Sequence, residues 1–424
     1  MTQSKITFLT QGCRLNQSET AVIERQFSPE TFLVTDDANT ADVVVVNTCT
    51  VTENGDADTR RLVRQLAARN PSVKVALIGC QAQILKEALL DLPNVTWVVG
   101  NSEKFNLAAI VGDASATVPQ VIVPKIERTS FTVPEVAIDR KHTRANLKIQ
   151  DGCDFFCAFC VIPFARGPAR SRQFGDILDE AKLLIAAGYK EIVLTGVNIG
   201  TYGDDGKSFL DVVTALDQLD GLKRIRISSI EPTTIPYELL DMMADPKSKV
   251  CRHLHIPLQS GTDTILKAMN RKYTLAEFDH FITEARRRVP GICIGTDVIV
   301  GFPGETDDLF SQAETYIRES VIDYIHVFTY SERLFARSKR LEGQVSVADK
   351  AKRSAALRGV SSRKRRLFLE SVLNQPTEVL LETQKHGYWT GLTDHYVRIY
   401  WEGNGIKNTF IPLTPGVVYR DGVK

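Results

Sequence analysis

The sequence contains no apolar run that could cross a bilayer, because none approaches the ~20 consecutive apolar residues that a membrane span requires. Its first residues, MTQSKITFLTQG, have neither the basic segment nor the long apolar segment of a secretory leader. We therefore expect a cytoplasmic protein without a membrane partner. Because that compartment keeps thiols reduced, the 8 cysteines are not expected to form a disulfide framework.

Net charge is also nearly absent, since the 424 residues sum to only +1. Hydrophobic residues at 43% and charged residues at 24% are typical of globular chains, and the length suggests two to four domains. Acidic residues are missing from one segment, 350–366, where eight cations gather. These are Lys350, Lys352, Arg353, Arg358, Arg363, Lys364, Arg365 and Arg366. The near-neutral total therefore hides a strongly basic segment.

Three cysteines, Cys153, Cys157 and Cys160, form a C-x₃-C-x₂-C pattern on one short segment. Cysteine thiolates are the usual protein ligands of a [4Fe–4S] cluster, so three of them leave one iron open for another ligand. The phenylalanines between them would form an apolar shell that limits solvent access and tunes the cluster potential. The pattern predicts an iron–sulfur site at which chemistry can occur.

Two other interpretations fit this cysteine loop less well. A structural zinc site needs four closed ligands, and no fourth Cys or His follows at a suitable short spacing. Incidental buried thiols are the second alternative, but so dense a cluster is unusual in a chain with only 8 cysteines.

The N-terminal part repeats one unit three times: an apolar strand, a cysteine just past its end, and a helix-compatible segment. The strands are expected at 6–9, 43–46 and 75–78, and the cysteines are Cys13, Cys49 and Cys80. Parallel strands bring their carboxyl ends to one edge, so these thiols should converge. We interpret them as ligands of a second metal cluster, against the alternative of three unrelated buried thiols.

A proline-rich connector is expected at 113–140, and strands alternate with helices after it. The strands are expected at 147–150, 192–195, 225–228, 253–258, 295–300 and 324–329, and helices at 176–187, 237–244, 274–288 and 307–319. Six such units predict a partial (βα)₆ barrel whose functional end holds the cysteine loop. The fold class is α/β, with an N-terminal parallel βα sheet domain before this barrel.

The tail changes character after a basic helical segment at 336–374. Short alternating runs at 377–382, 388–392, 396–401 and 408–413, separated by turn residues, predict a small C-terminal all-β barrel at 375–424. Aromatic residues interleaved with cations, such as Trp389 and Arg398, could stack bases and hold phosphates. Alternation also means that some of these aromatics only fill the barrel.

At this point the chain resembles the radical SAM methylthiotransferases, enzymes that use S-adenosyl-L-methionine (SAM). The three upstream cysteines, the central C-x₃-C-x₂-C loop and the final barrel are similar to the three domains of that family in order. The resemblance implies an N-terminal methylthiotransferase domain at 1–112, a radical SAM domain at 141–335 and a TRAM-like RNA-binding domain at 375–424. The C-x₃-C-x₂-C pattern alone indicates only the radical SAM superfamily. Cys13, Cys49 and Cys80 make the resemblance specific to the methylthiotransferase family.

Later motifs resemble the SAM-binding segments of this family: LTGVNIG at 194–200, RISSIEP at 226–232, HIPLQSG at 255–261 and TDVIVGFPG at 296–304. The resemblance implies SAM contacts at Thr195, Gly196, Asn198, Arg226, Ser228, Gln259 and Asp297. It implies RNA contacts at Arg363, Lys364, Arg365, Arg366, Trp389 and Arg398. Ordinary strand-to-helix turns are the alternative for the glycine-rich motifs.

The opening motif TQGCRLNQSET at 10–20 looks most like the branch that acts on N6-threonylcarbamoyladenosine in tRNA. The alternatives within the family are isopentenyladenosine in tRNA and ribosomal protein S12. One departure is local: the family often has Gly-Thr soon after the arginine of its Tyr-Ser-x-Arg segment, whereas this chain continues as LFAR at 334–337.

The resemblance implies two [4Fe–4S] clusters and SAM as cofactors. The central cluster would bind and reduce SAM to a 5′-deoxyadenosyl radical, and the N-terminal cluster would deliver sulfur that a second SAM methylates. No residue is nominated as acid or base.

Expected partners are the tRNA anticodon stem-loop and an electron donor such as a flavodoxin or ferredoxin, and the expected state is a monomer. A nucleic-acid-binding protein with structural clusters and a simple electron carrier are the alternatives. Cys251 and Cys293 are interpreted as buried structural thiols.

Overall fold

The computed structural model describes residues 3–112, 114–136, 138–139 and 142–424. The chain packs into two compact units. The first comprises Met1–Asp139, Asn146–Glu180 and Ser331–Lys339, and the second comprises Arg140–Ala145, Ala181–Tyr330 and Arg340–Lys424. The central cysteine loop thus packs with the N-terminal residues, and both cysteine sets share the first unit. The boundaries expected from the sequence, 112, 140, 335 and 374, stay a prediction.

A parallel six-stranded sheet forms the centre of the first unit, with strand order β2-β1-β3-β4-β5-β6. Its strands are β1 (Ser4–Thr10), β2 (Phe32–Val34), β3 (Val43–Thr48), β4 (Lys74–Gly79), β5 (Val95–Val99) and β6 (Gln120–Ile122). Every residue of β3 is buried, as expected for a continuous valine run in a sheet that is covered on both faces. The predicted N-terminal βα sheet is confirmed.

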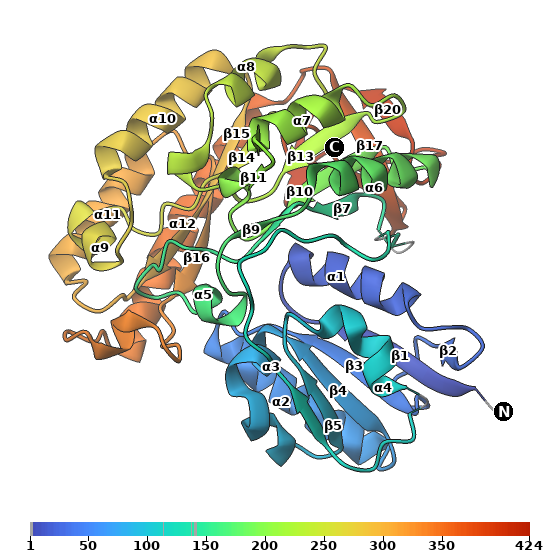
Figure 1. Ribbon diagram of the computed structural model, residues 1–424. Helices are drawn as coiled ribbons and strands as arrows, with labels where there is room; N and C mark the ends of the chain where they lie inside the picture. Colours follow the sequence, from blue (N-terminus) through green and yellow to red (C-terminus); the bar gives the residue numbers. More distant parts are fainter. Residues whose placement is uncertain (1–2, 113, 137, 140–141) are drawn as a thin grey trace. The chain divides into compact units, whose positions relative to one another are not determined.

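Helices cover the two faces of this sheet (Figure 1). Helices α2 (Glu53–Arg69) and α3 (Cys80–Leu85) pack on one face, where Val63 and Leu66 share a buried cluster with Val46 and Leu77 of the central strands. Helices α1 (Arg14–Arg25) and α4 (Leu107–Val111) pack on the other, around the fully buried Trp97. The side chain of Thr52 caps α2 by accepting from the backbone N of Gly55, so α2 starts just after Cys49.

Part of the expected connector joins the sheet as its sixth strand. Strand β6 pairs in parallel with β5, with Trp97 opposite Gln120 and Val99 opposite Ile122. Three residues are too few to show a periodicity, and flanking prolines read as a loop, which explains why the strand was not expected. Residues 113, 137, 140 and 141, in or beside the expected connector, lie outside the described residues.

Short elements frame the central cysteine loop in the first unit. They are β7 (Ala145–Lys148), β8 (Gln150–Asp151), α5 (Ile162–Ala165), β9 (Arg170–Ser171) and the start of α6 (Phe174–Ala186). Strands β8 and β9 pair antiparallel, with Asp151 opposite Arg170, so the loop that carries the cysteines is closed at its base.

Parallel strands followed by helices build the barrel part of the second unit. The strands are β10 (Glu191–Thr195), β13 (Arg224–Ile227), β14 (His253–His255), β15 (Cys293–Val300) and β16 (Tyr324–Thr329). Pairs β10–β13, β14–β15 and β15–β16 are parallel, and a bridge between Ser229 and His255 links β13 to β14. The helices are α7 (Phe209–Asp217), α8 (Glu238–Ala244), α9 (Asp263–Ala268), α10 (Leu275–Arg288) and α11 (Asp307–Glu319). The expected six strands, counting β7, are all present.

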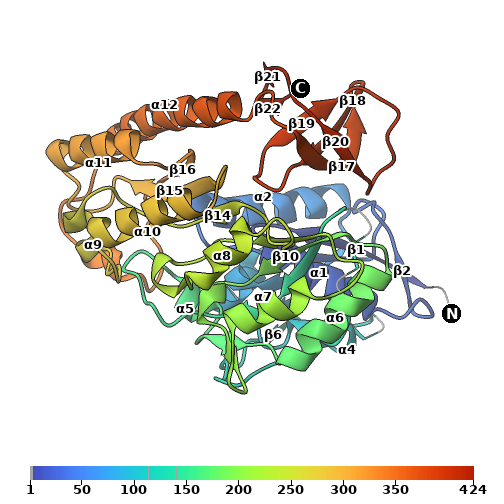
Figure 2. The same cartoon turned by 90° about the horizontal axis from the view of Figure 1, so that it is seen from above.

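The long helix α12 (Val347–Ser371) leads to the C-terminal sheet (Figure 2). That sheet has the order β20-β17-β18-β19-β22-β21, with strands β17 (Thr377–Lys385), β18 (Tyr388–Leu392), β19 (Arg398–Trp401), β20 (Phe410–Leu413), β21 (Val418–Tyr419) and β22 (Gly422–Val423). Phe368 and Leu369 of α12 share its core with Val379 and Ile399. A sheet module consistent with the expected small barrel is therefore present. Among the described residues, no helix combines the length and hydropathy needed to span a bilayer.

Candidate active site

Cys13, Cys49 and Cys80 meet at the carboxyl edge of the N-terminal sheet. Cys13 directly precedes α1, Cys49 follows β3, and Cys80 is the first residue of α3. A Cβ atom on Gly12 would lie 2.7 Å from the Cβ and 2.9 Å from the Sγ of Cys49, so the backbone beside Cys13 passes against that thiol. Cys49 also interacts electrostatically with both Cys13 and Cys80. The expected convergence of the three cysteines is present in the structure.

These thiols become progressively more buried from Cys13 to Cys80. Burial raises the pKa of the Cys49 thiol to about 11 and also raises the pKa of Cys80. The guanidinium of Arg166 opposes both increases because it favours the thiolate. Metal binding must displace these protons, since the thiolate is the ligand. Three soft donors beside a buried cation fit an anionic iron–sulfur cluster.

The central loop holds Cys153, Cys157 and Cys160 on one tight bend. The backbone N of Cys153 donates to the carbonyl of Gly167 at 3.1 Å, and that of Cys160 donates to the carbonyl of Cys157 at 3.0 Å. Gly152 has φ 72°, and a Cβ there would overlap the carbonyl oxygen of Pro168. The loop therefore needs glycine directly before its first cysteine. All eight cysteines of the chain are thiols, and this half-buried trio fits a cluster with one open iron.

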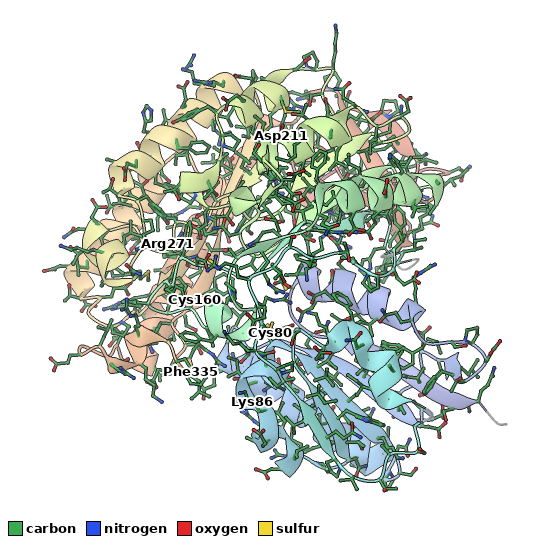
Figure 3. All side chains as sticks on the ribbon, in the orientation of Figure 1. Cys80, Lys86, Cys160, Asp211, Arg271 and Phe335 are labelled. Atoms are coloured by element: carbon green, nitrogen blue, oxygen red, sulfur yellow. The ribbon has the colours of Figure 1, made fainter. Side chains whose placement is uncertain are left out.

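The two cysteine sets lie on neighbouring segments of the first unit. Helix α3 begins at Cys80 and packs against α5, which follows Cys160. The residues in this small buried cluster are Cys80, Ile84, Val161 and Ala165. Asn101 links them further, because its Nδ2 donates to the Ala165 carbonyl at 2.6 Å and lies 3.8 Å from the Sγ of Cys80. Figure 3 labels Cys80 and Cys160 in this region.

The segment Ser331–Lys339, where the family pattern departs, is braced at both ends within the first unit. Arg333 forms a buried ion pair with Asp56 and donates to Thr50 Oγ1 at 2.9 Å. The backbone N of Ser338 donates to the carbonyl of Ala158, between Cys157 and Cys160, at 2.9 Å. The segment thus touches the N-terminal sheet domain and the central loop together.

Three exposed rings line this segment and the central loop. Phe335, labelled in Figure 3, tilts against Phe164 with 5.4 Å between ring centroids, and Phe164 meets Phe156 edge-on at 6.1 Å. Phe156 and Phe335 have positive φ values of 48° and 68°, which is strained for a bulky residue. Sequence reasoning did not single out this aromatic row, because its members are far apart in the chain.

Two expected SAM contacts, Thr195 and Ser228, lie side by side in the second unit. Register pairs Leu194 with Ile227, so the next residues of β10 and β13 are neighbours. Thr195 Oγ1 and Ser228 Oγ are buried and have no hydrogen-bond partner among the described residues. An unsatisfied buried hydroxyl costs roughly 1–3 kcal/mol, so this pair suits a polar ligand such as SAM.

Four more of the expected SAM contacts are Gly196, Asn198, Gln259 and Asp297. Gly196 and Asn198 occupy the turn after β10, and Gln259 has φ 71° and donates its backbone N to the Asp297 carbonyl at 2.8 Å. The Asp297 carboxylate lies 2.9 Å from His255 Nε2 and 3.4 Å from His326 Nδ1. Burial opposes its ionisation, but these two imidazoles hold the pKa of Asp297 well below its usual range. Their roles toward SAM stay a prediction.

Arg226, also expected at SAM, is engaged by the protein. Its Nε donates to Glu191 at 2.8 Å, and its terminal nitrogens donate to the carbonyls of Asp394 at 3.2 Å and Thr393 at 2.9 Å. The side chain therefore attaches the C-terminal sheet to the barrel strands, and a role in binding SAM stays a prediction. Cys251, which lies beside this guanidinium, and Cys293 are both buried, as expected for structural thiols.

The four consecutive cations of α12 differ in what they contact. Lys364 Nζ donates to the Ser320 carbonyl at 2.6 Å, and Arg365 donates to the Tyr396 carbonyl at 2.8 Å. These two residues hold the helix against its neighbours. Arg363 is exposed, and Arg366, also exposed, forms an ion pair with Glu370 at 2.8 Å. Arg363 and Arg366 are thus the cations best placed to meet a large polyanion.

A cavity of about 620 Å³ opens between α12, β16 and the C-terminal sheet. Five arginines line it: Arg144, Arg365, Arg366, Arg398 and Arg420. Only Glu382 and Asp421 contribute carboxylates to this lining, and Arg398 pairs with Asp421 at 3.2 Å. Trp389, the other expected RNA contact of the tail, is half-buried and packs against the sheet core. The cavity gives the cationic side chains a shared concave surface.

Parallel barrel strands and a three-cysteine loop in one chain are the features that define a radical SAM protein. Residues 147–315 match the radical SAM superfamily, and residues 5–100 match uncharacterized protein family UPF0004. The radical SAM methyltransferase TsrM from Kitasatospora setae has a similar fold, with a TM-score of 0.57 at 16% identity, covering 77% of this chain and 75% of that chain. A radical SAM family brings a [4Fe–4S] cluster and SAM.

Curated relatives narrow this class. The chain is 36% identical to threonylcarbamoyladenosine tRNA methylthiotransferase MtaB of Bacillus subtilis (strain 168), covering 94% of this chain and 90% of the relative. It is 35% identical to the enzyme of the same name from Aquifex aeolicus, covering 94% and 97%. It is 33% identical to tRNA-2-methylthio-N(6)-dimethylallyladenosine synthase of Thermodesulfovibrio yellowstonii, covering 92% and 91%. The chain belongs to the radical SAM methylthiotransferase family.

Proposed function

We propose that this protein converts N6-threonylcarbamoyladenosine next to the anticodon of tRNA, at position 37, to its 2-methylthio derivative. The observation that carries the proposal is the presence of two three-thiol sites on one compact unit. Several relatives that match along nearly their whole length bear the threonylcarbamoyladenosine name, which favours this base over the dimethylallyl one. The proposal includes a cytoplasmic monomer that receives electrons from a flavodoxin or ferredoxin.

In this proposal the two cysteine sets have separate tasks. Cys153, Cys157 and Cys160 would hold the cluster that supplies radical chemistry from SAM, and Cys13, Cys49 and Cys80 would hold a second [4Fe–4S] cluster for sulfur. The unpartnered hydroxyls of Thr195 and Ser228 would orient SAM by hydrogen bonding. Open coordination sites of this kind do not fit the alternative of closed structural clusters. The protein contributes binding, orientation and exclusion of side reactions.

The test of substrate and product is nucleoside mass spectrometry of tRNA. Deleting the gene should remove 2-methylthio-N6-threonylcarbamoyladenosine, and the anaerobically reconstituted protein with SAM and a reductant should restore it in that tRNA. Loss of a 2-methylthio-isopentenyl nucleoside instead would assign the dimethylallyl branch. An unchanged tRNA with altered ribosomal protein S12 would refute a tRNA substrate.

We expect Arg363 and Arg366 to carry RNA affinity without supporting the fold. Replacing both with glutamine should weaken tRNA binding and reduce the slope of log K against log salt by up to about 2, because each lost phosphate contact removes about one released counterion. Binding is measured by filter retention across a salt series. Lys223→Gln with Lys267→Gln removes two exposed cations from the barrel helices and loops and serves as the matched control. An equal slope in both double variants would place the RNA contact elsewhere.

A further inference from the structure

Five charged side chains are buried together in the first unit beside the two cysteine sets. They are Glu19, Lys104, Lys148, Asp151 and Arg166, each no more than 5% exposed. Glu19 accepts from Lys104 at 2.6 Å, from Lys148 at 2.7 Å and from Arg166 at 3.0 Å. Asp151 accepts from Lys148 at 2.7 Å and from Arg166 at 3.0 Å. Each carboxylate is thus shared among several cations.

The cations outnumber the carboxylates. Three cations against two acids leave one positive charge in excess, and the partly exposed Arg170, 3.4 Å from Asp151, adds to it. Burial lowers the pKa of Lys104 to about 8, which still leaves its ammonium the main form at neutral pH. A buried charge without a counter-charge is strongly unfavourable. An anion nearby would therefore stabilise this excess positive charge.

The contacts of Arg166 and Lys104 lead toward the cysteines and so indicate where that anion lies. Arg166 donates to Asn16 Oδ1 at 2.6 Å, and Asn16 Oδ1 lies 3.8 Å from the Sγ of Cys13. Lys104 donates to Asn101 Oδ1 at 2.7 Å, and Asn101 reaches the Sγ of Cys80. A [4Fe–4S] core with three thiolates carries a net charge of about −1, which is opposite in sign to the surplus and can offset it.

The same network reaches the central loop. Asp151 lies two residues before Cys153, and its Oδ1 accepts from the backbone N of Gly152 at 2.9 Å. Arg166 follows α5 directly and bonds Glu19 and Asp151 with one terminal nitrogen. One guanidinium thus joins the helix that follows Cys13 to the strand that precedes Cys153.

We propose that Arg166 is a positioning residue that supplies the counter-charge of the cluster on Cys13, Cys49 and Cys80 and fixes that site relative to the central cysteine loop. This inference rests on the proposed function. A neighbouring positive charge stabilises the more anionic reduced state of a cluster, so Arg166 raises its reduction potential. Lys104, acting through Asn101, adds to this effect at Cys80.

The test isolates the N-terminal cluster in a full-length variant with Cys153, Cys157 and Cys160 changed to alanine. Redox titration followed by electron paramagnetic resonance should give a lower potential for Arg166→Gln and a value near the parent for Arg166→Lys. Arg172→Gln is the matched control, because Arg172 is equally buried and pairs with Asp176 and Glu180 instead. Its potential should equal that of the parent.

An unchanged potential in Arg166→Gln with iron retained, or an equal shift in Arg172→Gln, would overturn the proposal. If Arg166→Gln holds no iron, Lys104→Met gives the same readout, and an unchanged potential there overturns it too. With the central cysteines intact, Arg166→Gln should raise the ratio of 5′-deoxyadenosine to methylthiolated nucleoside at least about tenfold, as expected for loss of an outer-shell partner. A potential shift in a protein that never methylthiolates tRNA would refute the proposed function and leave the electrostatic role standing.

Discussion

Cys49→Ala is expected to stop methylthiolation of tRNA completely while SAM is still cleaved to 5′-deoxyadenosine, whereas Cys157→Ala is expected to stop both. The physical reason is that the two residues belong to different thiol sets, at the edge of the N-terminal sheet and on the central loop. Each site offers three thiolates, so losing one leaves its cluster without stable protein ligation. Iron per chain should fall by about half in each variant.

Both products are measured in one anaerobic reaction, 5′-deoxyadenosine by liquid chromatography and the modified nucleoside by mass spectrometry of digested tRNA. Cys251→Ala is the control, because that thiol is buried beside Arg226 and far along the chain from either set. It should keep both activities and the full iron content. Methylthiolated product from Cys49→Ala would show that the N-terminal trio does not serve sulfur insertion.

Periodicity and cysteine spacing were sufficient to predict the architecture of the site. The valine run of β3 and the strand-then-cysteine repeat predicted a parallel sheet, and such a sheet places Cys13, Cys49 and Cys80 at one edge whatever the details. The same reasoning located the barrel strands within a few residues, because buried parallel strands are continuous apolar runs between turns.

Long-range polar partners could not be predicted in this way. Arg226 lies on a strand that resembles a SAM-facing motif, yet its donors meet Glu191 and two carbonyls near residue 393, which only the folded chain brings together. Glu19 and Arg166 are separated by 147 residues, and nothing local distinguishes them from surface charges. One usable signal was present: Glu19 follows Asn16 by one helical turn on the buried face of α1.

The departure from the family pattern at 334–337 is a second feature whose structure depends on long-range contacts that local sequence does not predict. The sequence indicated an altered loop, but it could not indicate that Phe335 would adopt a positive φ and meet Phe164. Arg333 and Ser338 hold that geometry through contacts with residues more than 150 positions away. Strained residues persist only where such surroundings fix them, so they are invisible to local propensity.

Gly152→Ala is expected to remove the central cluster selectively. Two effects add at this position: alanine at φ 72° costs roughly 1–2 kcal/mol, and its Cβ would overlap the Pro168 carbonyl oxygen, so the loop must move. Because Cys153 is the next residue, that movement displaces a cluster ligand. Iron per chain should fall by about half, reductive SAM cleavage should vanish, and the N-terminal cluster should keep its electron paramagnetic resonance signal.

Two glycines of the same chain separate these effects. Gly188→Ala introduces the same kind of strain at φ 96° with no atom within 4 Å of the new Cβ, so it should lower stability by roughly 1–2 kcal/mol and leave iron unchanged. Gly175→Ala meets no neighbour within 4 Å and no positive φ, so it should leave iron unchanged and should not lower stability, because alanine favours the helix α6 that contains it. Thermal unfolding and iron analysis of the three variants therefore distinguish strain from displacement. Full iron in Gly152→Ala would mean that the loop tolerates a side chain before Cys153. The close approach of the central cysteine loop to Gly167 and Pro168 would then not be needed to hold the cluster ligands.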